Sequence, residues 1–297
     1  MDGILVVNKP EGFTSFDVVA KMRGIIHQKK IGHTGTLDPD ATGVLPVLLG
    51  RATRLADLFA DDNKTYEAVI RLGVKTDTLD MSGTVLETSD ALVSEDEFLK
   101  VLPDFMGEIS QIPPMYSAIK VDGKKLYELA RAGKEVERKP RQVYIEEISL
   151  EEFSYPLARI KVSCSKGTYI RTLASDIGEK LGCHGAVEKL VRTRCGEFGI
   201  SSAITLDEIQ RLADEGELES VVLPLSAVLS RLKYFSVSSK FDKMLFNGNV
   251  LTASEVLGES EGEIANGERV VLLSEGGSII GIYEKRNGNL KPWKMLL

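Results

Sequence analysis

A short polar stretch at residues 33–46, HTGTLDPDATGVLP, combines residue types that could carry out chemistry on a stiff loop. It holds two acids, two prolines, two glycines, three threonines and one of the three histidines of the chain. Pro39 restricts the backbone after Asp38 and disfavours a helical conformation at Asp38 itself. A carboxylate fixed on such a loop is suited to act as a nucleophile or as a base.

Other interpretations of this stretch compete with a catalytic one. Asp, Pro, Gly and Thr are the common residues of turns, so the stretch could be purely structural. Asp38, Asp40 and Gly43 match positions 1, 3 and 6 of an EF-hand loop, but position 12 is Leu49 instead of the required glutamate, which excludes calcium. The spacing of Asp38, Asp40 and Thr42 also fits the nucleophile loop of haloacid dehalogenase-type phosphatases, although the polar residues 33–36 are unlike the buried strand that precedes such a loop.

Four further stretches match one known family together with residues 33–46, and in the same order. They are NKPEGFTSFDVV (8–19), KTYEAVIRLG (64–73), the long segment 111–141, and CSKGTYIRTLASDIG (164–178). The combination, which covers most of the chain, resembles the bacterial tRNA pseudouridine synthase B family. That family isomerises uridine 55 in the T loop of tRNA to pseudouridine by extruding the base. The resemblance implies the same reaction here, without metal or cofactor.

The resemblance assigns catalytic roles to three residues. Asp38 matches the family's essential carboxylate, and Arg171 its ionic partner, which we expect to lower the pKa of Asp38 and keep it charged. Tyr66 matches the tyrosine that stacks on the target base and takes part in handling its proton. From the residues alone, Arg171 would be a surface cation and Tyr66 a core tyrosine.

Further residues are implied to bind the substrate. His33 matches the residue that fills or supports the space left by the flipped base, and Tyr169 a pocket residue that contacts the flipped nucleotide. Leu190 matches an apolar wall of the pocket, for which a core leucine is the structural alternative. Lys9 and Pro10 match a segment that contacts RNA.

Positive charge is concentrated locally although the formal net charge is −7. Residues 120–141 hold eight Lys or Arg against four Asp or Glu, interleaved with tyrosine, a mixture suited to phosphate contact and base stacking. We therefore expect the insertion 111–141 to contact RNA. The basic residues predicted to bind RNA are Lys120, Lys124, Lys125, Arg131, Arg141, Arg192 and Arg194.

One segment departs from the family pattern. His184 comes early, Ala186 occupies the usual histidine position, and Val191 replaces the first of two arginines. Because Leu190 and Arg192 are retained, the departure puts an RNA contact in doubt and leaves the chemistry intact.

The periodicity of apolar residues predicts the elements that carry these side chains. Residues 3–8 are expected to form a buried strand and residues 143–148 another strand, and residues 15–27 a helix with Phe16, Val19, Met22 and Ile26 on one side. Strict alternation over 65–72 predicts a strand with Tyr66 on its apolar face.

The second half of the chain changes period several times. Residues 158–164 alternate as a half-buried strand, and a helical pattern from Ile170 to Leu181 follows Gly167, which places Tyr169 and Arg171 where a strand gives way to a helix. Residues 182–199 are expected to be loop and short elements. Capping pairs at Ser94/Glu97 and Thr205/Glu208 predict two more helices.

The mixture of strands and helices does not alternate as βαβ units, so we predict an α+β fold with a mixed, largely antiparallel central sheet flanked by helices. Residues 1–233 are expected to form the catalytic domain. Turn signals such as NG and GG separate short strands beyond residue 234. Residues 234–297 therefore predict a small β-rich domain, which in family terms resembles the PUA-type RNA-binding barrel.

Composition limits the remaining classes. No apolar run reaches the roughly 20 residues that span a membrane, and the N-terminal residues lack the basic segment of a secretory signal. Cys164, Cys183 and Cys195 lack a CxxC pair, which predicts reduced thiols in a cytoplasmic protein and argues against zinc. We expect a monomer that binds tRNA, with no membrane or DNA partner. The competing hypothesis from another class is a tRNA-binding or folding module without activity.

Overall fold

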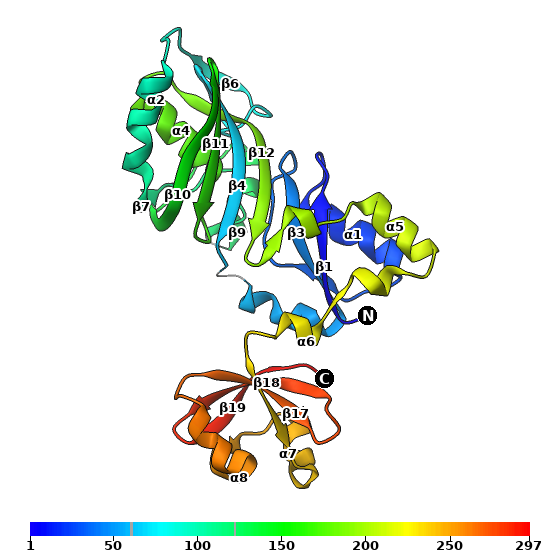
Figure 1. The fold of residues 1–297 in the computed structure, drawn as a ribbon. Helices are drawn as coiled ribbons and strands as arrows, with labels where there is room; N and C mark the ends of the chain where they lie inside the picture. The colour runs from blue at the N-terminus through cyan, green and yellow to red at the C-terminus, as the bar shows by residue number, and fades with distance from the viewer. Residues whose placement is uncertain (60–61, 122) are drawn as a thin grey trace.

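The computed structural model describes residues 1–59, 62–121 and 123–297 of the chain. Two sheets dominate the described residues, a ten-stranded sheet in the N-terminal part and a five-stranded sheet in the C-terminal part (Figure 1). Helices lie beside both sheets, so the predicted α+β class is confirmed. No helix of this described part is both long and apolar enough to cross a membrane.

The large sheet has the strand order β14-β1-β3-β12-β4-β11-β10-β7, with β2 paired to β3 and β13 paired to β12. Its neighbours run antiparallel except at the β12–β3 junction, where a short parallel pairing joins Val191 to Thr42. Its strands are β1 (Gly3–Lys9), β2 (Ile31–His33), β3 (Thr42–Leu49), β4 (Lys64–Leu72), β7 (Gly107–Gln111), β10 (Arg141–Ser154), β11 (Leu157–Cys164), β12 (Gly185–Cys195), β13 (Phe198–Gly199) and β14 (Leu223–Pro224).

Helices cover the large sheet in two separate groups (Figure 1). Helix α4 packs Leu173 and Ile177 into the cluster that contains Ala68 and Ile70 of β4. Helices α1 and α5 share a second cluster with the inner strands β1 and β3. The helices of this part include α1 (Ser15–Ile26), the 3-10 helix η1 (Gly50–Leu58), α2 (Glu95–Val101), α4 (Ile170–Lys180), α5 (Leu206–Asp214) and α6 (Leu225–Val228).

Two small hairpins complete the N-terminal part. Strands β5 (Val74–Thr76) and β6 (Val85–Thr88) pair with each other, and the turn between them approaches β12 through an isolated bridge from Asp80 to Val187. The insertion carries β8 (Lys120–Val121), β9 (Lys124–Lys125) and the short helix α3 (Leu126–Arg131).

Helix α1 differs from its expected orientation. The structure buries Val18, Val19, Met22 and Ile25 against β1 and β3, whereas Phe16 is 63% exposed. The expected apolar side was therefore right for Val19 and Met22 and wrong for Phe16. The capping box of Thr14 and Asp17 begins the helix, and the buried stripe lies one residue from the predicted one.

The expectation of loop and short elements over 182–199 was wrong, because β12 is an eleven-residue strand at the centre of the sheet. Register shifts against β4 between Val187 and Lys189 and between Arg192 and Arg194 interrupt the strand. Each irregularity resets the alternation of side chains, so the apolar residues of β12 show no sustained period of two.

The C-terminal sheet is a curled half-barrel with the order β15-β17-β18-β19-β16. The expected turns at residues 275–277 and 287–288 close the β17–β18 and β18–β19 hairpins, whereas the NG pairs at 247–248 and 266–267 precede strands without forming hairpins. Its elements are β15 (Lys233–Val237), α7 (Asp242–Phe246), β16 (Leu251–Thr252), α8 (Ala253–Leu257), β17 (Arg269–Ser274), β18 (Ile279–Arg286) and β19 (Asn289–Met295).

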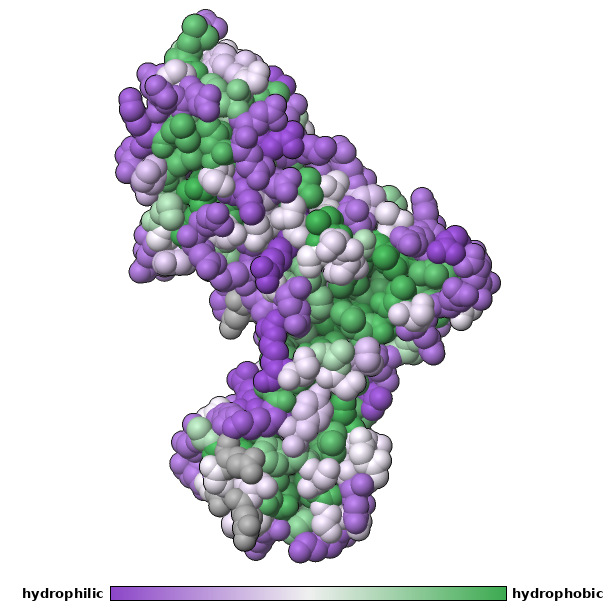
Figure 2. Space-filling model, in the orientation of Figure 1, coloured by the Kyte–Doolittle hydropathy of each residue, from purple (hydrophilic) through white to green (hydrophobic). Residues whose placement is uncertain are grey.

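The C-terminal sheet packs against η1. Val271, Ile282 and Leu296 share a hydrophobic cluster with Leu48 and Leu55 of the N-terminal part. Arg51 and Arg54 of η1 donate hydrogen bonds to the carbonyls of Leu296 and Met295 at 3.0 and 2.8 Å. In the view of Figure 2, apolar surface gathers over β1 between α5 and α6, while the rim of both parts is mostly hydrophilic.

Candidate active site

Asp38 lies on the loop that joins β2 to β3, which are antiparallel partners. Ser15 of α1 fixes the preceding residue, since its Oγ accepts from the Leu37 amide at 2.8 Å and donates to the Leu37 carbonyl at 3.3 Å. Lys9 Nζ donates to the carbonyls of Pro39 and Pro10, both at 2.8 Å, and to that of Phe13. These contacts fix the backbone on both sides of Asp38.

The predicted RNA contact of Lys9 does not fit the structure. Its side chain is fully buried, and burial lowers the pKa of Lys9 to about 8 against the opposing effect of Asp40 and Asp38. All three donors of the ammonium group point at backbone carbonyls. Lys9 therefore holds the loop together, and Pro10 contributes a carbonyl to this contact.

The structure also does not support the predicted RNA contact of Arg192, because this side chain on β12 is buried beneath the same loop. Its guanidinium donates to the carbonyl of Val44 through Nε at 2.7 Å, to that of Gly35 through Nη2 at 3.2 Å, and to that of Thr36 through Nη1 at 3.5 Å. Arg192 thus connects the loop of Asp38 to the central strand. The neighbouring Arg194 is exposed, and its RNA contact stays a prediction.

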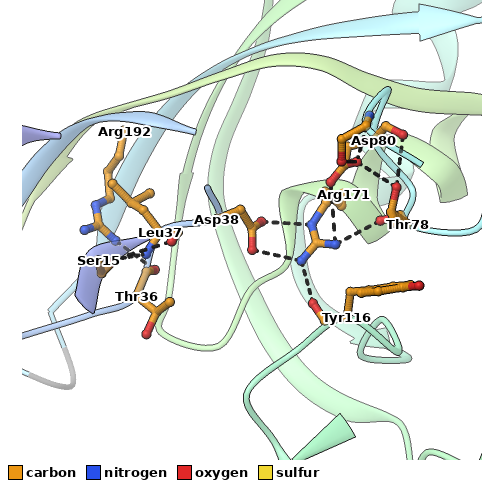
Figure 3. A network of polar contacts seen from close by, with 10 residues as sticks. Ser15, Thr36, Leu37, Asp38, Thr78, Asp80, Tyr116, Arg171 and Arg192 are labelled. Atoms are coloured by element: carbon orange, nitrogen blue, oxygen red, sulfur yellow. Dashed lines mark hydrogen bonds and ion pairs between the residues drawn. The ribbon is translucent and has the colours of Figure 1, made fainter. Parts of the chain in front are cut away.

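Arg171, in the first turn of α4, faces Asp38 (Figure 3). Its Nε lies 2.9 Å from Asp38 Oδ2, and its Nη2 donates to Oδ1 at 3.0 Å. The remaining donors reach the carbonyls of Thr78 at 2.9 Å and Tyr116 at 2.8 Å, and Asp80 Oδ2 lies 3.7 Å from Nη1. The expected ion pair of Asp38 and Arg171 is confirmed, and it is bidentate, the stronger geometry for an arginine–carboxylate pair.

The expected direction of the Asp38 pKa was wrong. Burial raises the pKa of Asp38 above its ordinary value, with further raising by Asp80 and Asp40, while Arg171 opposes the shift without reversing it. The reason is desolvation, which disfavours the charged carboxylate more than one arginine favours it. The side chain is nevertheless 38% exposed at the cavity wall, so a ligand can reach it.

Three cavities share Asp38 and Arg171 in their walls and have volumes of about 910, 280 and 340 Å³. The third is also lined by Tyr66 of β4, Tyr169 before α4 and Leu190 of β12. The structure therefore brings five of the predicted site residues together around one space. His33 lines the largest cavity instead.

The two tyrosines keep their protons at neutral pH. Burial raises the pKa of Tyr66 to about 12, although Arg192 opposes the shift, and burial also raises the pKa of Tyr169. Gln111, at the start of the insertion, positions Tyr169 by accepting from its amide at 3.0 Å and donating to its carbonyl at 3.3 Å. Both side chains are thus neutral phenols in the cavity wall.

His33 is electrically neutral in this environment. Burial lowers the pKa of His33, and the charge of Arg192 lowers it further. Its Nδ1 is buried and has no hydrogen-bond partner among the described residues. A neutral imidazole at the cavity wall is suited to packing against an uncharged base.

The basic residues of the insertion divide into two groups. Lys125 and Arg131 line the largest cavity together with Tyr127, whose ring lies 5.3 Å from Lys125 Nζ and 5.6 Å from the Arg131 guanidinium. Lys120, Lys124 and Arg141 do not line the three cavities. RNA binding by both groups stays a prediction.

Sequence reasoning missed the residues that support Arg171. Asp80 accepts from Thr78 Oγ1 at 2.7 Å and from the Ser82 amide at 3.2 Å, which fixes the turn between β5 and β6 beside Arg171. The acid-rich TDTLD at 76–80 was the available signal, because two short carboxylates among threonines favour a turn with local side-chain hydrogen bonds.

His184, one of the residues that depart from the family pattern, does not line the three cavities at Asp38. His184 Nδ1 lies 3.0 Å from Glu179 and its Nε2 lies 3.5 Å from Glu87, which places it in a surface charge cluster. Cys183 beside it is buried and free, as are the other two cysteines. Within the described ranges, no group of three or more His, Cys, Asp or Glu side chains is arranged to hold a metal ion.

Comparison with known proteins identifies the family. Residues 23–170 match the N-terminal domain of the TruB family pseudouridylate synthases, and residues 171–230 match the tRNA pseudouridylate synthase B C-terminal domain. The chain is 42% identical over 306 residues to tRNA pseudouridine synthase B of Geobacillus thermodenitrificans, with 99% of each chain covered. It is 47% identical over 300 residues to the Dehalococcoides mccartyi protein of the same name, covering 100% of this chain and 97% of that one.

A solved structure supports the same assignment. A chain in the crystal structure of a Cbf5-Nop10-Gar1 complex superposes with a TM-score of 0.74 at 25% identity, covering 99% of this chain and 85% of that chain. Family profiles, full-length relatives and fold therefore agree, and the chain belongs to the TruB family of pseudouridylate synthases.

Proposed function

We propose that this chain converts uridine 55 in the T loop of tRNA into pseudouridine, with Asp38 as the nucleophile. One observation carries the proposal: a carboxylate held through both oxygens by a buried arginine, in the wall of a cavity that also presents Tyr66, Tyr169 and Leu190. Membership of the family and the names of the full-length relatives support the reaction type and the tRNA substrate.

The reaction breaks the bond between ribose C1′ and uracil N1, turns the base, and forms a bond between C1′ and C5. The hydrogen at C5 is released as a proton and N1 gains one, so the reaction is redox-neutral. An ionised Asp38 can attack the ribose, attack the base, or remove a ribose proton, and each route needs the carboxylate charged. Arg171 fixes both oxygens of Asp38 and thereby orients the attacking lone pair.

The cavity walls have the chemistry to hold the detached base. The ring of Tyr66 provides a flat surface for stacking, and Leu190 an apolar contact. With a pKa of about 12, Tyr66 acts as a neutral phenol and not as a phenolate base. The base must first leave the RNA stack, which requires a few kcal/mol that stacking in the cavity and phosphate contacts offset.

The rest of the chain is assigned to RNA binding in this proposal. Residues 1–233 act as the catalytic domain, the insertion 111–141 contacts the T stem-loop, and residues 234–297 act as a PUA-like RNA-binding domain. Lys125 and Arg131 at the cavity edge support the phosphate contact. The enzyme is proposed to work as a monomer in the cytoplasm, without metal or cofactor.

The test uses an unmodified tRNA transcript incubated with the purified chain in EDTA, followed by mapping of pseudouridine along the RNA. We expect pseudouridine at position 55, and its loss with Asp38→Asn. The matched control is Asp90→Asn, which removes an exposed carboxylate outside the three cavities and leaves the pair with Arg171 intact.

The two alternatives predict different results in this assay. A tRNA-binding module would bind the transcript, form no pseudouridine and be indifferent to Asp38→Asn. A phosphatase that uses Asp38 would release phosphate only with magnesium, and EDTA would abolish its activity. Pseudouridine formed equally well by Asp38→Asn would remove the assigned nucleophile.

A further inference from the structure

Phe16 is exposed beside the cavity of Asp38. Its side chain is 63% exposed in the first turn of α1, and it lines the 910 Å³ cavity together with Asp38. The core face of the same helix is formed by Val18, Val19 and Met22, and Phe16 lies outside the hydrophobic clusters of the described residues. The packing of the protein thus provides no reason for a large apolar ring at this position.

Arg23 restricts the ring of Phe16. The guanidinium lies 5.8 Å from the ring centroid, within the range of a cation–π contact, and its Nη2 donates to the carbonyl of Ile31 at 3.2 Å. A guanidinium that is held by a backbone carbonyl while it lies over the ring reduces the freedom of the ring. An exposed aromatic side chain that is already ordered loses less entropy when a flat ligand stacks on it.

The surrounding charges favour an uncharged aromatic ligand. The cavity also carries Asp40, Asp77 and Asp80, which repel a phosphate, while Lys125 and Arg131 line it from the insertion. A nucleic-acid backbone is therefore attracted to the cavity wall formed by the insertion. The wall that carries the three aspartates favours an uncharged base. The proposed function places the target base against Tyr66 and Tyr169 in the 340 Å³ cavity, and neither tyrosine lines the cavity at Phe16, which leaves that space for another nucleotide.

We propose that Phe16 is a stacking platform for a second unpaired base of the RNA substrate, distinct from the base that reacts. This inference rests on the proposed function, because it takes the RNA that reaches Asp38 as the ligand. Stacking uses the face of a base, which every base has, so the site accepts a purine or a pyrimidine.

The test measures binding of a T stem-loop hairpin RNA to the full chain carrying Asp38→Asn, so that the RNA stays chemically unchanged. In that background, Phe16→Ala should weaken the Kd by about 5- to 150-fold, the range for one lost aromatic stack, and Phe16→Trp should restore it. Tyr144→Ala is the matched control, because this aromatic side chain is 54% exposed and lies outside the three cavities. Thermal unfolding should be unchanged in all three variants.

Abasic nucleotides then identify the stacked base. An abasic nucleotide placed in turn at each unpaired position of the loop should abolish the effect of Phe16→Ala at one position other than the target uridine. The inference is overturned if the effect survives at every position, if it vanishes only at the target uridine, or if Phe16→Ala binds like the parent chain. Because binding is read without turnover, failure of the isomerase assay with the wild-type chain would instead count against the proposed function alone.

Discussion

Gly43 of β3 and Arg192 of β12 touch through their backbones at the parallel junction of the large sheet. A Cβ on Gly43 would lie 2.3 Å from the Arg192 carbonyl oxygen, and the φ angle of Gly43 is +102°. The two strands approach so closely here that only glycine fits. The same contact aligns the Arg192 side chain beneath the loop of Asp38, so the sheet junction and the site depend on one glycine.

Gly43→Ala should therefore damage both stability and activity. We expect a loss of about 2–4 kcal/mol in the free energy of unfolding, from backbone strain plus a clash that neither strand can relieve alone. Urea unfolding measures it. Gly216→Ala is the control, because Gly216 has a φ of +75° with no atom within 4 Å of the added Cβ, and it should lose only the strain of about 1–2 kcal/mol.

Arg192→Met should separate the positioning role of this residue from an RNA contact. Three carbonyls of the Asp38 loop and its following strand would lose their donor, and we expect about 2–5 kcal/mol of destabilisation together with a lower kcat. The dependence of RNA binding on salt should keep its slope, since no phosphate contact is lost.

The exposed Arg194 provides the contrast. If Arg194 contacts a phosphate, Arg194→Met should reduce the slope of log K against log salt by about one and leave stability unchanged. A reduced slope for Arg192→Met with normal stability would contradict its buried position.

Arg171→Lys should lower kcat although the charge is kept. A lysine is a point donor and cannot hold both carboxylate oxygens while also reaching the Thr78 and Tyr116 carbonyls. We expect a loss of about 10- to 150-fold, equivalent to one charged hydrogen bond. The control is Arg159→Lys on β11, where a half-exposed arginine pairs with Glu152; equal activity of both variants would contradict the bidentate role.

The sequence predicted those parts of the site that have local signals or matching motifs. Alternation over 65–72 put Tyr66 on the core side of β4, and the switch of period at Gly167 located Tyr169 and Arg171 at the start of α4. The pairing of Asp38 with Arg171 spans 133 residues, and the matched motifs supplied it where periodicity could not.

Other features depend on tertiary contacts that no local pattern encodes. The residue types of Lys9 and Arg192 alone predict cations that bind phosphate. In the structure both side chains are buried and donate hydrogen bonds to backbone carbonyls. The register shifts of β12 interrupt the alternation that would have predicted a strand. In α1, a buried face displaced by one residue from the predicted face leaves Phe16 on the surface. The direction of the Asp38 pKa shift likewise depends on how far burial removes the carboxylate from water. The presence of a neighbouring arginine does not predict the extent of that burial.

Asp176→Asn should stabilise the protein at neutral pH. Burial, with a smaller contribution from Glu179, raises the pKa of Asp176 from 3.8 to about 6. Because the folded state holds the proton more tightly, the favourable contribution of Asp176 is complete below about pH 3.8 and is lost as the pH rises through about 6.

An asparagine avoids that loss, and after allowance for the partial exposure of Asp176 we expect a gain of about 1 kcal/mol at pH 7. Urea unfolding between pH 4 and pH 8 measures the difference, which should shrink toward pH 4. The exposed Asp90→Asn is the control; a gain that is independent of pH would contradict the assigned cause.

The pH dependence of kcat/KM should report the raised pKa of Asp38. The proposed reaction needs the ionised carboxylate, so activity should fall as the pH is lowered through the pKa of Asp38 in the free enzyme, above the 3.8 of an ordinary aspartate. Asp80→Asn should move this acid limb to lower pH, because it removes a negative charge that raises the Asp38 pKa and that competes for Arg171. Arg171→Lys should move the acid limb to higher pH, because the weaker partner opposes the effect of desolvation less.

Steady-state rates at saturating and limiting RNA, with circular dichroism to confirm folding at each pH, measure both shifts. An acid limb at or below 3.8, or one that neither variant moves, would show that a group other than Asp38 limits the reaction.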